Sequence, residues 1–261
     1  MNIVDCHVHT AFSFDSKEPM ENYVKTAAEL GDTYFISTEH VDLESFILNR
    51  EDILRDIDRQ VEVVKQLNEK YPVKVLLGVE LGWRKSIRDR IDAIGKKYPF
   101  DMIVLSVHET EYADVAYPDY VKGRSVDECF EEYLDLALQA IEDFENFDSF
   151  AHIDYLLRYI GDTDLYRHKE SLEKVFRRLI KKGKALEINT KVFPDKASLR
   201  RAGEIIKMYT DLGGKKFTLG SDSHSAPVYK NGFEAVVKML KANGVKYVCH
   251  YVARQEHHVE I

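Results

Sequence analysis

The sequence has 261 residues, of which 44% are hydrophobic and 31% charged, and its formal net charge is −8. This length suits one or two domains, and a (β/α) barrel regularly occupies it as a single unit. An acidic excess is atypical of surfaces that bind nucleic acid or anionic membranes, so neither partner is expected. No apolar run approaches the ~18 residues of a membrane span and no leader-like segment is evident, which favours the cytoplasm.

Short apolar runs alternate with longer amphipathic segments along the chain. Runs typical of strands lie at 2–7, 33–38, 73–81, 101–108, 148–153, 185–189, 216–222 and 246–252. Helical patterns lie between them at about 19–30, 51–70, 86–97, 127–145, 169–183, 198–212 and 231–243. Glycines stand where helix C-caps are expected, at Gly31, Gly183, Gly213 and Gly244. The stretch 109–126 is expected to be a loop over one face.

The order of these elements predicts the fold class. A strand followed by a helix, seven times over, indicates a parallel sheet with helices outside. The glycine-rich turn of a nucleotide-binding open sheet does not follow the first strand. We therefore expect a single α/β barrel domain over residues 1–261. The cysteines (Cys6, Cys129 and Cys249) are widely spaced and odd in number, so neither a disulfide framework nor a Cys-x-x-Cys metal site is expected.

Histidine and acidic side chains gather at the ends of the predicted strands. Ends of parallel strands meet on the catalytic face of a barrel. In chain order the residues are His7, His9, Asp15, His40, Glu80, His108, His152, Asp222 and His224. Such a cluster would be costly to bury unpaired, whereas divalent cations would satisfy it. One catalytic ion takes about three or four protein ligands, so nine groups would serve about three ions. The other histidines, His168, His250, His257 and His258, are expected to be surface or packing residues.

Short motifs around these residues resemble a known family. HVH at 7–9, EH at 39–40, GVE at 78–80, SVH at 106–108, AHID at 151–154 and GSDSH at 220–224 are similar to the successive motifs of the polymerase-and-histidinol-phosphatase (PHP) family, from Asp5 to about Leu240. The stretches PFDMIVLSVH, LEINT and TLGSDSH look most like its bacterial histidinol-phosphate phosphatases. The resemblance implies a distorted (β/α)7 TIM-like barrel with a trinuclear metal site at the C-terminal ends of the strands.

The resemblance also implies how the ions are shared. His7, His9, Glu80 and Asp222 would hold one ion, and Asp15, His40 and His224 a second. Glu80 would bridge to a third ion, held with His108 and His152. Mixed nitrogen and oxygen ligands do not separate zinc from manganese or iron.

The reaction that the resemblance implies is hydrolysis of L-histidinol phosphate to L-histidinol and phosphate, and a hydroxide that bridges two ions is the expected nucleophile. Arg158 is the expected clamp on the phosphoryl oxygens because a guanidinium can grip two oxygens at once. Lys191 is a weaker second candidate, since KVFPDK departs from the family pattern after LEINT. Asp42, just beyond His40, is expected to serve the leaving group or the substrate amine.

Two other interpretations stay open. The same site could act on another small phosphate ester or on a phosphotyrosine protein, although VDCHVHTAFSFDS lacks the first motif of that phosphotyrosine-specific branch. Alternatively, the chain could be a non-catalytic metal-binding or polymerase-associated module, against which the full ligand set argues. The oligomeric state is not indicated by the sequence.

Overall fold

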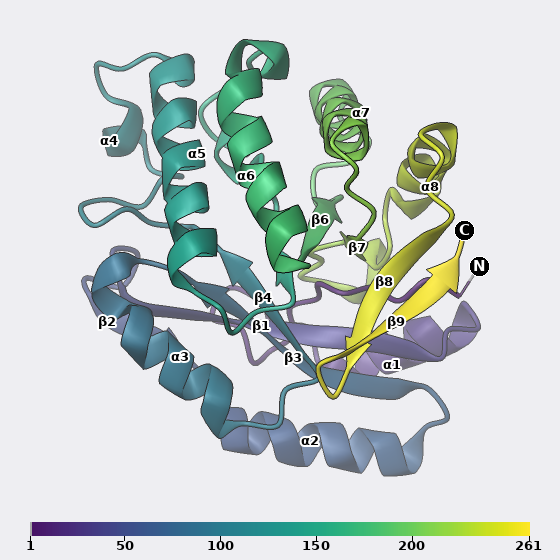
Figure 1. The fold of residues 1–261 in the computed structure, drawn as a ribbon. Coiled ribbons are helices and arrows are strands. Elements are labelled where there is room, and N and C mark those ends of the chain that lie inside the picture. Colours follow the sequence, from purple (N-terminus) through teal and green to yellow (C-terminus); the bar gives the residue numbers. More distant parts are fainter. Residues whose placement is uncertain (1) are drawn as a thin grey trace.

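The computed structural model describes residues 2–261 and consists of a mostly parallel sheet surrounded by helices (Figure 1). The strand order in the sheet is β2-β1-β3-β4-β5-β6-β7. Its strands are β1 (Tyr34–Ser45), β2 (Glu51–Leu54), β3 (Lys74–Gly82), β4 (Met102–Ser106), β5 (Ser149–Phe150), β6 (Ala185–Asn189) and β7 (Phe217–Gly220). A separate antiparallel hairpin contains β8 (Tyr247–Val252) and β9 (Gln255–Glu260).

The helices follow the amphipathic segments of the sequence. They are α1 (Met20–Glu29), α2 (Ile57–Lys70), α3 (Arg88–Lys97), α4 (Pro118–Val121), α5 (Val126–Asp143), α6 (Lys169–Lys182), α7 (Lys196–Asp211) and α8 (Phe233–Ala242). The predicted C-cap glycines all have positive φ, as at Gly183, which ends α6 with φ 68°. Side-chain caps begin other helices, and Ser125 and Glu128 form a complete capping box at α5.

The N-terminal segment Asp5–His9 joins the two ends of the parallel sheet. Backbone amides of Ile36 and Thr38 in β1 donate to its carbonyls, and its own amides donate to the carbonyls of Leu219 and Ser223 at β7. This pairing takes the form of isolated bridges, so the regular strand predicted over 2–7 is wrong in detail. With this segment as one of seven parallel elements, the chain forms the predicted distorted (β/α)7 barrel.

The barrel interior has an apolar zone and a polar zone at different levels along the strands. Residues two or four apart in a strand share a face, so Leu76 and Glu80 of β3 both point inward. Leu76 belongs to an apolar cluster that includes Cys249 and Tyr251 of the hairpin. Arg254, in the hairpin turn, donates to Asp148 just before β5 at 2.6 Å. The hairpin therefore covers the N-terminal ends of the strands and leaves the opposite mouth for the polar residues.

Several predicted elements differ from the structure. The segment Glu51–Leu54, expected to begin a helix, is β2 and pairs antiparallel with β1, where it buries Ile53. The helix that follows begins at Ile57, capped by Asp56. The strand expected at 148–153 is reduced to Ser149–Phe150, and the expected loop 109–126 contains α4. The strand at 246–252 is real but lies outside the parallel sheet.

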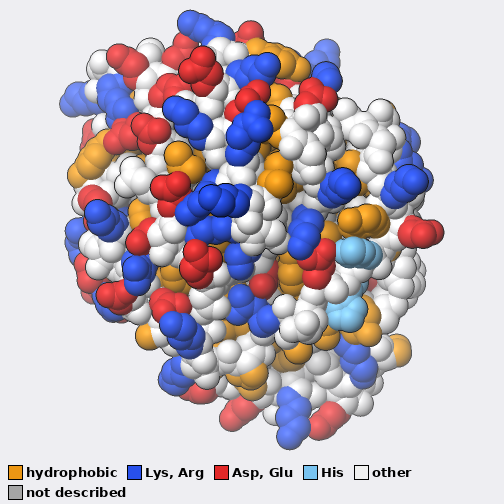
Figure 2. Space-filling model, in the orientation of Figure 1, with side chains coloured by type: hydrophobic (Ala, Val, Ile, Leu, Met, Phe, Trp, Pro, Cys, Tyr) orange, Lys and Arg blue, Asp and Glu red, His pale blue; other side chains and the backbone are white. Residues whose placement is uncertain are grey.

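The surface is mixed in charge. Basic and acidic side chains are interspersed over the face seen in Figure 2. Among residues 2–261, no helix is long and apolar enough to cross a membrane.

The hairpin is expected to contribute to the stability of the whole barrel. Tyr251 is only 5% exposed, so Tyr251→Ala should lower the free energy of unfolding by about 3 kcal/mol through lost burial and a residual cavity. Urea denaturation measures this change. Tyr166→Ala, at a site 49% exposed, is the matched control and should stay within about 0.5 kcal/mol of wild type. Equal stabilities for the two variants would contradict the packing role of the hairpin.

Candidate metal centre

The centre of the barrel mouth is the carboxylate of Glu80. This side chain, near the end of β3, is fully buried. Five imidazoles from different parts of the chain surround its two oxygens. Oε1 lies 2.9 Å from Nε2 of His152 and 3.1 Å from Nε2 of His108. Oε2 lies 2.9 Å from Nδ1 of His40, 3.3 Å from Nε2 of His7 and 3.5 Å from Nε2 of His9.

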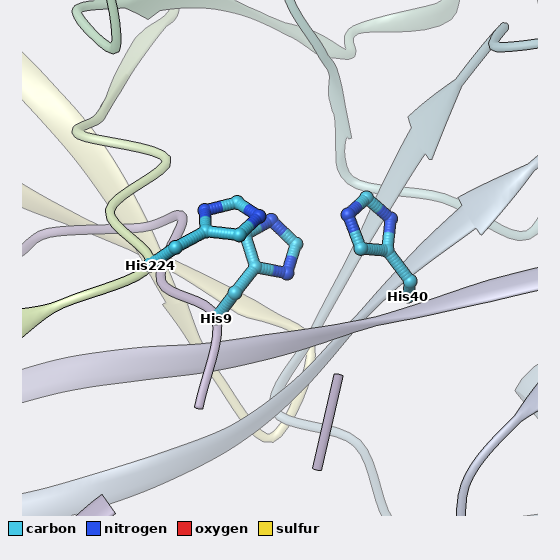
Figure 3. Close-up of side chains that lie close together, drawn as sticks. All are labelled: His9, His40 and His224. Atoms are coloured by element: carbon cyan, nitrogen blue, oxygen red, sulfur yellow. The ribbon is translucent and has the colours of Figure 1, made fainter. Parts of the chain in front are cut away.

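The remaining predicted ligands lie on the outer side of this group. Oδ1 of Asp222 is 3.3 Å from Nε2 of His9. Oδ2 of Asp15 is 2.8 Å from Nε2 of His224 and 3.7 Å from Nε2 of His40. Figure 3 shows His9 between His40 and His224, with ring centroids 4.1 Å and 4.4 Å away respectively. The structure therefore brings all nine predicted residues into one continuous cluster.

The donor atoms of this cluster fit divalent cations. Within the described chain, Nδ1 of His40, Nε2 of His108 and Oε2 of Glu80 are buried without an aligned hydrogen-bond partner. They nevertheless lie in close contact around one carboxylate, as the distances above show. Ligand atoms within 4.8 Å of one another occur in several sets, among them His7–His9–Asp222, His9–His40–His224 and His40–Glu80–His108. Converging imidazole and carboxylate lone pairs of this kind are the usual donors for zinc, manganese and iron.

The charges in the cluster act on one another. Burial would raise the pKa of Glu80, but the nearby rings of His7, His108 and His40 hold it well below its usual value. Burial would lower the pKa of His40, yet the carboxylate of Glu80 raises it to about 10. His9 behaves differently, because burial and the neighbouring His40 ring lower its pKa well below the usual value. The central carboxylate is thus held ionised, as a cation ligand must be.

Two buried carboxylates that the sequence interpretation missed support the histidines. Glu187 in β6 accepts a hydrogen bond from Nδ1 of His7 at 2.7 Å and from the backbone amide of His152 at 2.9 Å. Gly220 provides the space for it, since a Cβ there would lie 2.0 Å from Oε1 of Glu187. The second carboxylate is Glu39, which binds the loop after His9. In LEIN the available signal was an acidic residue within a mostly apolar strand, whereas in STEH the neighbours of Glu39 are themselves polar and gave no such signal.

Asp42, expected to serve the leaving group or the substrate amine, is buried against two histidines of the cluster. Its Oδ1 is 2.8 Å from Nδ1 of His108, and its Oδ2 is 3.5 Å from Nδ1 of His40. A Cβ at Gly82 would lie 1.8 Å from Oδ1 of Asp42, so the glycine provides room for this carboxylate. Asp42 therefore orients a histidine in this arrangement, and its contact with a substrate stays a prediction.

Both predicted cationic residues contact Asp222 of the cluster, and Lys191 also contacts His224. Nη1 of Arg158, in a short 3-10 turn after β5, donates to Oδ2 of Asp222 at 2.9 Å, and the Arg158 side chain is buried. Nζ of Lys191 lies 3.1 Å from Oδ1 of Asp222 and 2.9 Å from Nδ1 of His224. A cavity of about 240 Å³ adjoins Lys191, Asp222 and His224. The mouth thus combines a histidine–carboxylate cluster with two positive side chains.

A barrel with histidines and carboxylates at its strand ends is an arrangement suited to metal-ion catalysis. The chain belongs to the PHP domain family, whose model matches residues 5–191. The resemblance seen in the sequence motifs is confirmed.

Proteins similar to this chain carry the name histidinol-phosphatase or histidinol phosphate phosphatase. The probable histidinol-phosphatase of Clostridium acetobutylicum is 33% identical, over 94% of this chain and 96% of that protein. The histidinol-phosphatase of Lactococcus lactis is also 33% identical, over 87% of this chain and 86% of that protein. A crystal structure of histidinol phosphate phosphatase from L. lactis, complexed with zinc, L-histidinol and phosphate, superimposes with a TM-score of 0.89 and 28% identity. That match covers 98% of this chain and 99% of the other.

Proposed function

We propose that this protein is a metal-dependent phosphomonoesterase that hydrolyses L-histidinol phosphate to L-histidinol and phosphate. The observation that carries the proposal is the match over 98% of the chain to a protein that holds zinc, L-histidinol and phosphate. The histidine–carboxylate cluster gives that match a chemical basis in the residues of this chain.

In this proposal the nine clustered residues hold three divalent ions. His7, His9 and Asp222 form one potential ligand set, and His40, Glu80 and His108 form another. Glu80 contacts rings of both sets, which supports a bridging position. When bound, divalent ions supply positive charge that acidifies a nucleophilic water and neutralises charge on the phosphoryl oxygens. Zinc is the ion in the L. lactis structure, and the same donors also suit manganese and iron.

The cationic side chains of the chain are assigned to the phosphoryl group. Arg158 is buried and held by Asp222, so its planar guanidinium is pre-positioned to donate to phosphoryl oxygens. Lys191 is more exposed at the edge of the cavity and adds a flexible second cation. Asp42 fixes the ring of His108 and places negative charge near the mouth, where it would favour a cationic substrate amine.

A second candidate function is the hydrolysis of another small phosphate ester or of a phosphotyrosine protein by the same centre. The metal cluster and both cations serve any phosphate monoester, because they address the phosphoryl group. Assaying the purified protein against a panel of phosphate monoesters separates these functions. We expect the highest kcat/KM for L-histidinol phosphate, and a clear preference for phosphotyrosine peptides would overturn the assignment.

Metal dependence is the first consequence of the proposed centre. The protein as purified should contain metal approaching three equivalents, and removal by a chelator should abolish phosphatase activity because both nucleophile and charge stabilisation are lost. Elemental analysis and a phosphate-release assay measure these quantities. Restored activity on adding zinc or manganese is the control. Full activity in a metal-free preparation would contradict a metal-dependent reaction.

The bridging position of Glu80 predicts a wider metal loss than removal of a peripheral ligand. Glu80→Ala should lower occupancy at two sites, because its oxygens face two groups of rings. His224→Ala should lower occupancy chiefly at one site, since its Nε2 faces Asp15 at the rim. Elemental analysis measures how much metal each variant loses, and thermal unfolding is the control for the fold. Equal single-site losses would exclude bridging.

The guanidinium of Arg158 is expected to stabilise the transition state. Its loss resembles removal of one oxyanion donor, so Arg158→Ala should lower kcat/KM by roughly 100-fold or more. Arg158→Lys should recover only part of this, because an ammonium lacks the planar fork. The exposed Arg167, paired with Asp127, supplies the matched control: Arg167→Ala should leave turnover unchanged. Wild-type turnover in Arg158→Ala with intact metal content would contradict this role for Arg158 and leave Lys191 as the candidate that binds the phosphoryl oxygens.

A further inference from the structure

Ser13 stands between a predicted metal ligand and a buried carboxylate that the mechanism above does not use. The Ser13 hydroxyl lies 2.7 Å from Oε2 of Glu39 and 3.0 Å from Nδ1 of His9. The backbone amide of His40 donates to the same hydroxyl at 3.2 Å. Ser13 and Glu39 are both buried. Two of the predicted ligands are therefore connected to Glu39 through one serine.

Proton counting fixes the direction of these hydrogen bonds. A hydroxyl has one proton to donate and two lone pairs, and an ionised carboxylate can only accept. Glu39 accepts from the backbone amide of Thr10 at 3.0 Å, from the Thr10 hydroxyl at 2.7 Å and from the Ser37 hydroxyl. The single proton of Ser13 therefore points at Glu39. Its lone pairs are left for the amide of His40 and for an N–H at Nδ1 of His9.

The consequence is a defined tautomer of His9. With the proton on Nδ1, a neutral ring carries its lone pair on Nε2. That nitrogen faces the cluster, 3.3 Å from Oδ1 of Asp222 and 3.1 Å from Nε2 of His7. The opposite tautomer would direct an N–H at the place where a cation must bind. The direction of the Ser13 proton thus decides whether His9 can be a ligand.

We infer that Glu39, acting through Ser13, is a positioning residue that holds His9 in the metal-binding tautomer and ties the loop after His9 to β1. This inference rests on the proposed metal function of the same site. His7 and His108 receive comparable support directly, from Glu187 and Asp42. His9 differs because a hydroxyl relays the effect, so a single buried serine can be removed without touching either the ring or the carboxylate.

The structure also predicts how a conservative change at Glu39 behaves. Oε2 accepts a backbone amide, whose direction cannot reverse, whereas Oε1 accepts two hydroxyls, which can rotate. In Glu39→Gln, the side-chain amide nitrogen should therefore occupy the Oε1 position, and the side-chain oxygen should remain at the Oε2 position beside Ser13. The proton of Ser13, and with it the tautomer of His9, is then retained despite the loss of charge.

The test compares Ser13→Ala and Glu39→Gln with Ser37→Ala, which removes a different hydroxyl from the same carboxylate. Zinc affinity is measured by competition with a chelator, and the His9 tautomer by nitrogen-15 NMR of the imidazole in the metal-free protein. Ser13→Ala should weaken one zinc equivalent by about 10- to 100-fold, as loss of an outer support to a ligand typically does, and should mix the His9 tautomers. Glu39→Gln and Ser37→Ala should match the wild type in both measurements.

Two results would overturn the inference: wild-type zinc affinity with an unchanged His9 tautomer in Ser13→Ala, or an equal loss of affinity in Ser37→Ala. Thermal unfolding of each metal-free variant separates these effects from loss of the fold. Failure of the proposed function is distinguishable, because a wild-type protein that takes up no zinc, manganese or iron would refute the metal centre. The NMR measurement on the metal-free protein would still test the Ser13 relay in that case.

Discussion

A single buried carboxylate, Glu80, organises this protein. An isolated charge of this kind in a barrel interior would be prohibitively costly, and five imidazoles offset the cost here. The rings come from the N-terminal segment, from β1 and from the ends of β4 and β5. The arrangement of parallel strands points these side chains at one place. The barrel thus serves as the scaffold of the central carboxylate.

The same strand carries both the stability and the chemistry of the interior. Leu76 of β3 lies in the apolar cluster beneath the mouth. Gly78 and Glu80 follow it on the same face of the strand, two and four residues further along. A Cβ at Gly78 would come within 2.6 Å of the Ile36 side chain, so the strands approach closely between the two zones. Because Gly78 lies between Leu76 and Glu80, the apolar packing is kept apart from the ionised groups. The mouth can therefore hold charged side chains without disrupting the core.

The sequence predicted the cluster well because one rule covers it: parallel strands end on the same face, so their terminal histidines and acids must meet. The supporting carboxylates, Glu187 and Glu39, were missed because their role depends on which rings they face, and adjacency in space is not visible in one strand. The β2 segment was misassigned because its pairing uses the free edge of β1 beyond the N-terminal segment. The position of the β8–β9 hairpin depends on packing against the barrel floor, which local patterns do not encode.

The N-terminal segment places an unusual demand on the growing chain. Its neighbours on one side are in β1, but on the other they are in and beyond β7, and the amide of Ser221 reaches the Asp5 carboxylate across 216 positions. Contacts so distant in sequence carry a loop-closure entropy cost that must be met before they can stabilise the fold. During synthesis His7 and His9 therefore leave the ribosome long before Asp222 exists to face them. Completion of the histidine–carboxylate cluster and closure of the barrel therefore both require segments from the two ends of the chain, and neither can precede the synthesis of Asp222.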